Sequence, residues 1–205
     1  MVARSRVEVM ERMTTDEFFR DAPEDRKAEL IDGVMMMPSP PLVIHERLVS
    51  FLLTLLRLYA DEFDLGEVLG SRTAVALAED QAPEPDILFV ARERQHIVQS
   101  KGIVGAPDLV IEILSSGTAK VDRGPKFVAY ERAGVRELWL IDPYGPAGSE
   151  FYQLRGGRFV PVMPDENDRL SAVTVPGFWV DVNWLWPRER FVPVGQALAQ
   201  IVGEQ

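Results

Sequence analysis

The chain has 205 residues, of which 46% are hydrophobic, so it can build one domain with a full core and no covalent support. It has no cysteine, which excludes disulfides, zinc–thiolate sites and thiol nucleophiles. Its formal net charge of −10 argues against a generic basic surface for nucleic acid, so a phosphate-bearing partner would need a local cation or a bound metal ion.

The first half of the chain predicts a short helix, a hairpin, a long helix and a strand. Thr14 and Glu17 have the spacing of a capping box at the start of the short helix. Residues 28–37 form two short strands, or one bent strand, around the turn dipeptide Asp32-Gly33. Helical spacing of apolar residues marks a helix over 45–63, and residues 67–77 are typical of a strand with a bulge at Gly70.

The second half predicts a parallel crossover followed by hairpins. Two apolar strands, 86–91 and 108–114, flank a polar loop with one helical turn, and a helix over 122–133 then leads to a buried strand at 136–142. The rest of the chain is typical of antiparallel hairpins and a short C-terminal helix over 193–205. We therefore expect an α/β fold with a mixed central sheet, as one domain over residues 1–205, with residues 1–13 as a loose N-terminal arm.

No apolar run reaches the roughly 18 residues of a membrane span, and no continuous apolar segment follows the basic N-terminus as in a signal peptide. We therefore expect a cytoplasmic protein without a membrane partner.

Two carboxylates in the segment PDLVIEILS raise the question of a site. Side chains alternate along a strand, so Asp108 and Glu112 share a face, about 13 Å apart. They are too far apart to bind one ion together, but in an antiparallel pair Asp86 would lie beside Glu112. Two such carboxylates suit Mg²⁺. The alternatives are an ion pair with arginine for Glu112 and a structural acid at the strand start for Asp86; for Asp108 we favour hydrogen bonding to loop amides.

The helix after this strand carries further candidates. Asp122, Lys126 and Tyr130 lie on one helical face. Asp122 is expected to be the N-cap, with Pro125 in the first turn, and Lys126 to direct its ammonium at a phosphate. The alternative for Lys126 is a solvated side chain paired with Asp122.

Three residues nearer the N-terminus are weaker candidates. His45 and Glu46 are expected either to cap the long helix or to point to solvent, unless they reach the site, and Glu29 is expected to be an edge-strand acid or a further site residue.

These residues, in order, resemble the Uma-type putative restriction endonuclease family, a branch of the PD-(D/E)XK nucleases. The resemblance covers about residues 14–190 and is carried by these segments: ELIDG (29–33), SP (39–40), His45, PD (85–86), DLVIEILS (108–115), the D-x3-K-x3-Y run (122, 126, 130), GV (134–135) and WLIDP (139–143). It implies a restriction-endonuclease-like fold, with Asp86 and Glu112 as metal ligands. The sequence departs from the family pattern at Leu114, which stands where the superfamily has lysine. Lys126 resembles the migrated replacement, and the first-helix acid of the family would fall near His45 or Glu46.

The resemblance implies an endonuclease that uses Mg²⁺ or Mn²⁺ to hydrolyse phosphodiester bonds of DNA. Arg92, Arg94, Lys101 and Arg123 could contact the DNA backbone. The alternative is an inactive nuclease-fold protein that serves as a nucleic-acid-binding or assembly subunit. A homodimer could bury the three tryptophans of the C-terminal region (Trp179, Trp184 and Trp186), although packing within the core explains them equally well.

Overall fold

The computed structural model describes residues 12–187 and 189–203. The expected N-terminal arm therefore lies outside the described residues up to position 11. At its end, the Met13 amide donates a 2.9 Å hydrogen bond to the Gly33 carbonyl, which ties the chain to the first hairpin.

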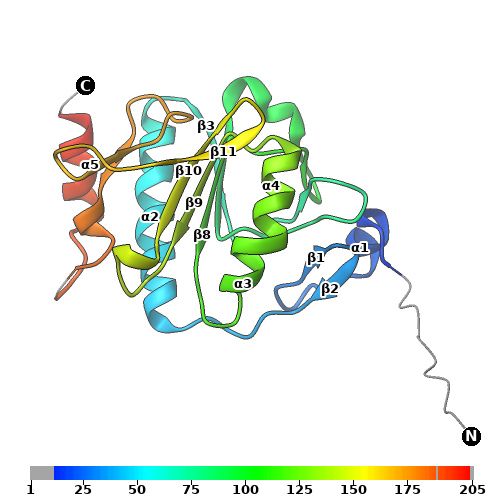
Figure 1. The fold of residues 1–205 in the computed structure, drawn as a ribbon. Coiled ribbons are helices and arrows are strands. Elements are labelled where there is room, and N and C mark those ends of the chain that lie inside the picture. The colour runs from blue at the N-terminus through cyan, green and yellow to red at the C-terminus, as the bar shows by residue number, and fades with distance from the viewer. Residues whose placement is uncertain (1–11, 188, 204–205) are drawn as a thin grey trace, which may run out of the picture.

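A six-stranded mixed sheet forms the centre of the molecule (Figure 1). Its spatial order is β11-β10-β9-β8-β5-β3. Only β8 and β9 are parallel to each other, and the other neighbours are antiparallel. The strands of this sheet are β3 (Gly66–Gly70), β5 (Ile87–Ala91), β8 (Leu109–Ile113), β9 (Glu137–Ile141), β10 (Glu150–Arg155) and β11 (Arg158–Val162). The predicted mixed sheet and its parallel crossover are confirmed.

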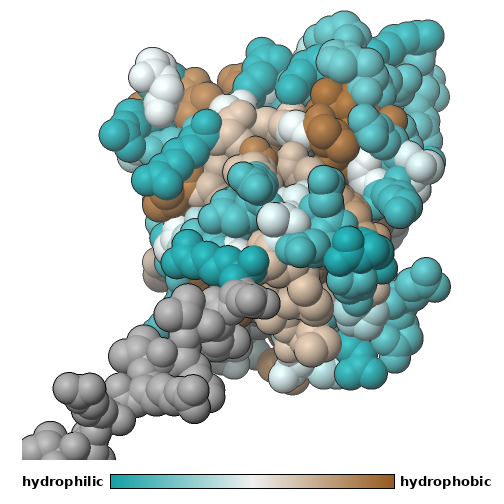
Figure 2. Space-filling model, turned by 90° about the vertical axis from the view of Figure 1, so that its right-hand side faces the viewer, coloured by the Kyte–Doolittle hydropathy of each residue, from teal (hydrophilic) through white to brown (hydrophobic). Residues whose placement is uncertain are grey.

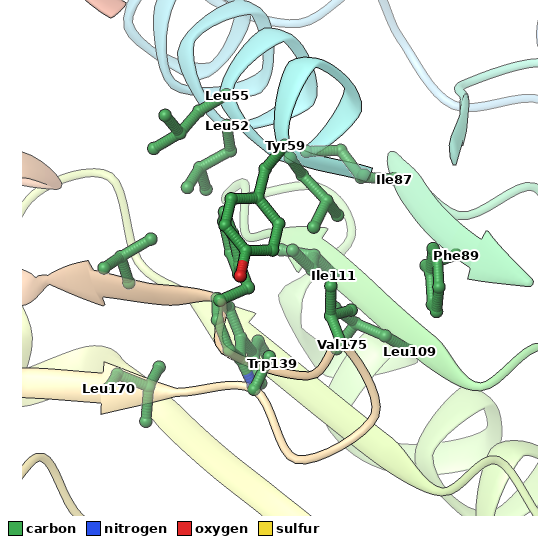
Figure 3. Packing of buried hydrophobic residues seen from close by; sticks show 14 of the residues in the cluster. Leu52, Leu55, Tyr59, Ile87, Phe89, Leu109, Ile111, Trp139, Leu170 and Val175 are labelled. Atoms are coloured by element: carbon green, nitrogen blue, oxygen red, sulfur yellow. The ribbon is translucent and has the colours of Figure 1, made fainter. Parts of the chain in front are cut away.

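Helices cover both faces of the sheet because the central strands are apolar on both sides. Leu109, Ile111 and Ile113 pack toward α2 (Val43–Glu62), whose apolar stripe they meet (Figure 3). Val110 packs in the opposite direction, toward α4 (Phe127–Ala133). The helix α5 (Val194–Val202) extends the first core by packing against α2.

The remaining strands form small sheets beside the central one. The hairpin β1 (Glu29–Ile31) and β2 (Val34–Met36) turns at Asp32-Gly33, where both residues have positive φ, as predicted. It joins the body through a bridge between Leu30 and Ala82. The other strands are β4 (Val75–Ala76), β6 (Val98–Gln99), β7 (Gly102–Val104), β12 (Arg169–Ser171) and β13 (Trp179–Asp181). Hydrophilic side chains, with hydrophobic patches between them, cover the face that carries this hairpin and α1 (Thr15–Asp21) (Figure 2).

Several predicted elements are confirmed, and two need correction. The capping box of α1 is present, since the Thr14 amide donates to Glu17 Oε2 at 2.8 Å and the Thr14 hydroxyl accepts from the Glu17 amide. The single strand expected over 67–77 is wrong: β3 ends at Gly70, and β4 belongs to another sheet. The loop after β5 has a 3₁₀ helix, η1 (Arg92–Ile97), before β6 and β7.

The crossover helix is also less regular than predicted. It begins with α3 (Ala119–Val121), continues through a π-helical turn η2 (Asp122–Lys126), and only then becomes α4. Gly124 has φ −110° and ψ −106°, which breaks the helical path immediately before Pro125. Asp122 therefore lies inside the helical segment, and its predicted role as N-cap is wrong. The predicted end at Gly134 is confirmed, with φ of 87°.

The C-terminal tryptophans pack within the chain. Trp184 is buried and lies 5.4 Å, centroid to centroid, from Trp179, and the Arg169 guanidinium lies 4.2 Å from the centroid of the Trp179 ring. The Trp186 indole donates a 2.7 Å hydrogen bond to the Asp142 carbonyl. These contacts fit the core-packing alternative, and the homodimer stays a prediction. No helix among the described residues has the length and hydrophobicity required to span a bilayer.

Candidate active site

Asp86 and Glu112 lie beside each other at one end of the central sheet. The antiparallel register pairs Ile87 with Ile111, so the next pair outward is Asp86 opposite Glu112. The Ile113 amide donates to Asp86 Oδ2 at 2.9 Å, which fixes that carboxylate against β8. Both residues are almost completely buried, at 4% and 2% exposure. The geometry thus brings together the two acids whose proximity the sequence predicted.

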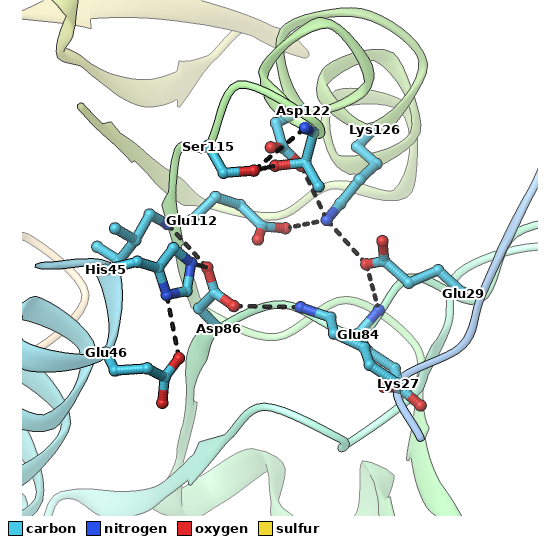
Figure 4. Close-up of polar contacts among 12 residues, drawn as sticks. Lys27, Glu29, His45, Glu46, Glu84, Asp86, Glu112, Ser115, Asp122 and Lys126 are labelled. Atoms are coloured by element: carbon cyan, nitrogen blue, oxygen red, sulfur yellow. Dashed lines mark hydrogen bonds and ion pairs between the residues drawn. The ribbon is translucent and has the colours of Figure 1, made fainter. Parts of the chain in front are cut away.

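Two basic side chains from outside the central sheet contact Asp86 (Figure 4). Lys27, just before β1, places its Nζ 3.1 Å from Oδ1, and His45, in the first turn of α2, places Nε2 3.1 Å from Oδ2. Burial alone would raise the pKa of Asp86, but the His45 hydrogen bond and the Lys27 charge outweigh it and hold the pKa below its usual value. Burial lowers the pKa of His45, but the hydrogen bonds and charges of Asp86 and Glu46 together outweigh it, and the net shift is upward. Asp86 is therefore ionised and fully partnered.

The Lys126 ammonium lies in a cage of three carboxylates. Its Nζ is 2.7 Å from Glu112 Oε1, 2.9 Å from Glu29 Oε1 and 3.0 Å from Asp122 Oδ1. The side chain is only 2% exposed, so the expectation of a solvated lysine is wrong, although the predicted contact with Asp122 is present. Burial lowers the pKa of Lys126, but Glu112 and Glu29 raise it well above the usual value. Lys126 is a permanently charged, immobilised group.

Glu112 has more negative charge around it than its partners neutralise. Its Oε1 forms the ion pair with Lys126 and accepts a 2.6 Å hydrogen bond from the Tyr130 hydroxyl. Burial raises the pKa of Glu112 and Lys126 lowers it, while Asp122 and Asp86 add to the rise, so that the pKa reaches about 8. Helical spacing predicted that Asp122, Lys126 and Tyr130 share one face. The structure confirms this in spite of the π-helical turn, since all three side chains lie in the same cluster.

Two further acids and Lys27 complete the cluster. Of these residues, Glu29 was a weak candidate from the sequence, and Lys27 and Glu84 were not predicted. Glu29 Oε1 accepts from the Glu84 amide at 3.0 Å as well as from Lys126. Glu84 Oε2 is buried without a hydrogen-bond partner, and burial raises the pKa of Glu84 to about 7. The available signal was position: Glu84 immediately precedes the Pro85-Asp86 pair, and Glu29 opens the segment ELIDG.

Asp108 lies outside this cluster, at the opposite end of β8. Its Oδ2 accepts from the Ala91 amide at 2.9 Å, as the preferred interpretation predicted, and its Oδ1 lies 2.7 Å from Arg94 and 3.2 Å from Arg136. Its inclusion among the possible site residues is therefore corrected. Glu46 remains at the margin: its side chain is 57% exposed and contacts His45 Nδ1 at 3.2 Å.

The basic residues expected to meet DNA do not surround the acids. Arg92 and Arg94 follow the far end of β5, a strand-length of about 16 Å from Asp86. They pair with Asp64 and Asp108, and Arg123, nearer the cluster, pairs with Glu150. Lys101 is exposed in the turn between β6 and β7. Arg92, Arg94 and Lys101 therefore lie away from the paired acids, and their contact with the DNA backbone stays a prediction.

The donor set fits a hard divalent cation with few protein ligands. In the part of the chain that the structure describes, no group of three His, Cys, Asp or Glu side chains could hold a metal ion on its own. Mg²⁺, however, is commonly bound by one or two carboxylates, with water and substrate phosphate completing the shell. Asp86 and Glu112 supply such a pair, and burial together with the charges of Asp122 and Asp86 raises the pKa of Glu112.

Comparison with known proteins identifies the family and the fold of the chain. The family model Uma2, described as putative restriction endonuclease, matches residues 15–183, and the chain belongs to that family. No curated protein matches the chain. The chain is similar to the crystal structure of a putative nuclease belonging to DUF820 from Anabaena variabilis, with a TM-score of 0.63 and 19% identity over 92% of this chain and 99% of the other. At that identity the likeness demonstrates a shared fold, and it confirms the expected nuclease-like architecture.

Proposed function

We propose that the protein is an endonuclease that requires Mg²⁺ or Mn²⁺ and hydrolyses phosphodiester bonds of DNA, with Asp86, Glu112 and Lys126 at its centre. The observation that carries the proposal is the pairing of two buried carboxylates across β5 and β8, with an ammonium 2.7 Å from one of them. A divalent ion held by such a pair polarises a phosphate and lowers the pKa of an attacking water. Membership of the restriction endonuclease family supports the same activity.

Two residues would hold the metal ion, and their neighbours orient these two ligands. Asp86 and Glu112 would be the metal ligands. Ile113 and His45 orient Asp86 through its Oδ2 atom, and Lys126 with Tyr130 orients Glu112 through its Oε1 atom. Because three carboxylates enclose its ammonium, Lys126 acts as a positioning residue for Glu112. Asp122 and Glu29 hold Lys126 in turn.

Plasmid nicking tests the activity. Purified protein with Mg²⁺ or Mn²⁺ should convert supercoiled DNA to nicked or linear forms, and chelation should stop it. Asp86→Asn and Glu112→Gln should each lower the rate by at least about 10²-fold, because the metal contributes several kcal/mol to the barrier reduction. A matched control is Glu137→Gln, which alters another buried glutamate of the same sheet, bonded to Thr174 and Trp139. Site variants as active as the control would reject the assignment.

A second candidate is a nuclease-fold protein that binds nucleic acid or partners without turnover. The observation that favours it is the full engagement of Lys126 by three acids, together with Leu114 at the superfamily's lysine position. Titration with Mn²⁺ separates the two candidates. An enzyme should bind the ion at a site that Asp86→Asn removes, whereas a scaffold should bind it equally in both proteins.

A further inference from the structure

Two lysines contact the paired carboxylates, and their surroundings differ. Lys126 has a side-chain exposure of 2% and three carboxylate partners. Lys27 has a side-chain exposure of 25%, and within the described residues it forms one ion pair, the 3.1 Å contact with Asp86 Oδ1. Moving the Lys126 ammonium would leave three buried carboxylates unneutralised, which is expensive. Moving Lys27 would break one contact, between a partly exposed ammonium and a buried carboxylate, which costs less than leaving three carboxylates without their cation.

The position of Lys27 is informative because its ammonium contacts an oxygen of Asp86, a candidate metal ligand. Asp86 Oδ2 is already used by the Ile113 amide and by His45, so Oδ1 is the oxygen left for a metal ion. The Lys27 ammonium occupies that oxygen. A divalent cation and an ammonium repel each other at such a distance, so Lys27 has to leave Asp86 when the carboxylate binds an ion.

We propose that Lys27 is the mobile cation of this site: it neutralises Asp86 in the metal-free protein and, once released by metal binding, contacts the phosphate of the nucleic acid. Lys27 precedes β1 on a segment outside the central sheet, and a flexible lysine stem lets the ammonium turn toward solvent, where a phosphate would approach. Lys126, the lysine expected from the family pattern to meet the phosphate, cannot do so without emptying its cage. This inference rests on the proposed metal-dependent nuclease function and names the residue that would supply the charge facing the substrate.

The proposal predicts that replacing Lys27 strengthens Mn²⁺ binding and weakens DNA binding. Lys27→Met keeps the apolar stem and removes the charge. Isothermal titration with Mn²⁺ should show about fivefold tighter binding, because a competing cation of modest pairing energy has left Asp86. Binding of a short DNA duplex, measured by fluorescence anisotropy with Ca²⁺ as the ion, should weaken by about tenfold, because a charged hydrogen bond to phosphate is lost. Lys27→Arg should restore most of the DNA affinity.

The controls use a second lysine and a ligand variant. Lys120→Met removes an exposed lysine from α3 and should change neither measurement. Asp86→Asn should abolish Mn²⁺ binding and so assign the binding event to this carboxylate. A lysine that served only to stabilise the fold would instead weaken both Mn²⁺ and DNA binding when replaced.

The outcomes are separable from the nuclease activity itself. Unchanged or weaker Mn²⁺ binding by Lys27→Met overturns the inference, whatever the protein does to DNA. Unchanged DNA affinity in Ca²⁺ overturns the phosphate contact. Wild-type protein that binds Mn²⁺ and DNA as described but never cleaves rejects the proposed endonuclease and leaves the role of Lys27 standing.

Discussion

At one end of the β5–β8 pair lies Asp108, and at the other lie Asp86 and Glu112; all three carboxylates are buried. Asp108 meets two arginines whose side chains are 30% and 56% exposed, so its charge is balanced by groups that remain in contact with solvent. At the other end, acids outnumber bases within one cluster, whose members are Glu29, Glu84, Asp86, Glu112 and Asp122 against Lys27, His45 and Lys126.

This difference separates a structural acid from a candidate ligand. Asp108 has a complete set of partners, and the chain has no need of another cation there. At the acid-rich end, burial raises the pKa of Glu112 to about 8, and Glu84 has a buried oxygen without a hydrogen-bond partner, so the polar groups there are only partly satisfied. Buried polar networks that are only partly satisfied are costly, and they occur where function requires them. The comparison therefore favours the acid-rich end for the metal ion that we propose at Asp86 and Glu112, and it predicts distinct responses at the two ends.

The largest effect is expected at Lys126. Lys126→Met would leave Glu29, Glu112 and Asp122 together without their shared cation, and loss of one member of a buried ion network costs about 3–5 kcal/mol. Urea denaturation monitored by circular dichroism measures the loss. Addition of Mn²⁺ should recover part of the lost stability, because the ion would supply positive charge near the three carboxylates. A variant as stable as wild type would show that the cage does not neutralise charge in the folded protein.

Contacts that follow from strand geometry could be predicted from the sequence, and contacts between separate sheets could not. The meeting of Asp86 with Glu112 was predictable, because strand alternation and antiparallel pairing fix it. The contacts of Glu29 and Lys27 could not be predicted in this way. The β1–β2 hairpin forms its own sheet and contacts the body through a bridge at Leu30, which has no signature in the hydrophobic pattern of the sequence.

The errors have local causes of a different kind. Pro125 was compatible with the first turn of a helix, and Asp122 with its N-cap, but the chain accommodates the proline by a break at Gly124 inside a longer helical segment. The fold around Glu112 was still predictable, because the apolar strands flanking the crossover determine the sheet irrespective of how the helix begins. The position of Arg92 and Arg94 follows from chain direction, because they come directly after the end of β5 that is opposite to Asp86.

A smaller effect is expected when the balanced end is altered. Asp108→Asn should lower stability by about 2 kcal/mol, because it removes the charge of a buried acceptor for Arg94 and the Ala91 amide. It should leave Mn²⁺ affinity unchanged, in contrast to Glu112→Gln, which should abolish or strongly weaken it. Titration calorimetry on the two variants makes the comparison direct. If Asp108→Asn lost the ion as well, the two ends would not be independent.

The pH dependence of stability should reveal the raised pKa of the buried Glu84 carboxyl. The pKa of Glu84 rises from its ordinary 4.5 to about 7 because of burial, so the folded state binds the proton more tightly than the unfolded state. The free energy of unfolding therefore falls as pH rises between 4.5 and 7 and stays low above that range. Glu84→Gln removes this term. It should match wild type at acidic pH and exceed it by about 2 kcal/mol at pH 8. Urea denaturation at pH 5 and pH 8 provides the four values required; an equal difference at both pH values would contradict the interpretation.

The smallest effect is expected at Tyr130, and it sharpens the distinction between holding a ligand and holding the fold. Tyr130→Phe deletes the hydroxyl that donates to Glu112 Oε1 at 2.6 Å and leaves the ring in the core. Stability should change by about 1 kcal/mol, the usual net value of a hydrogen bond. Because Lys126 still contacts the same oxygen, Glu112 should stay in place, and Mn²⁺ affinity should shift by no more than about threefold, which is below the effect of one hydrogen bond. A far larger loss of Mn²⁺ affinity at unchanged stability would mean that the tyrosine, rather than the lysine, orients the carboxylate.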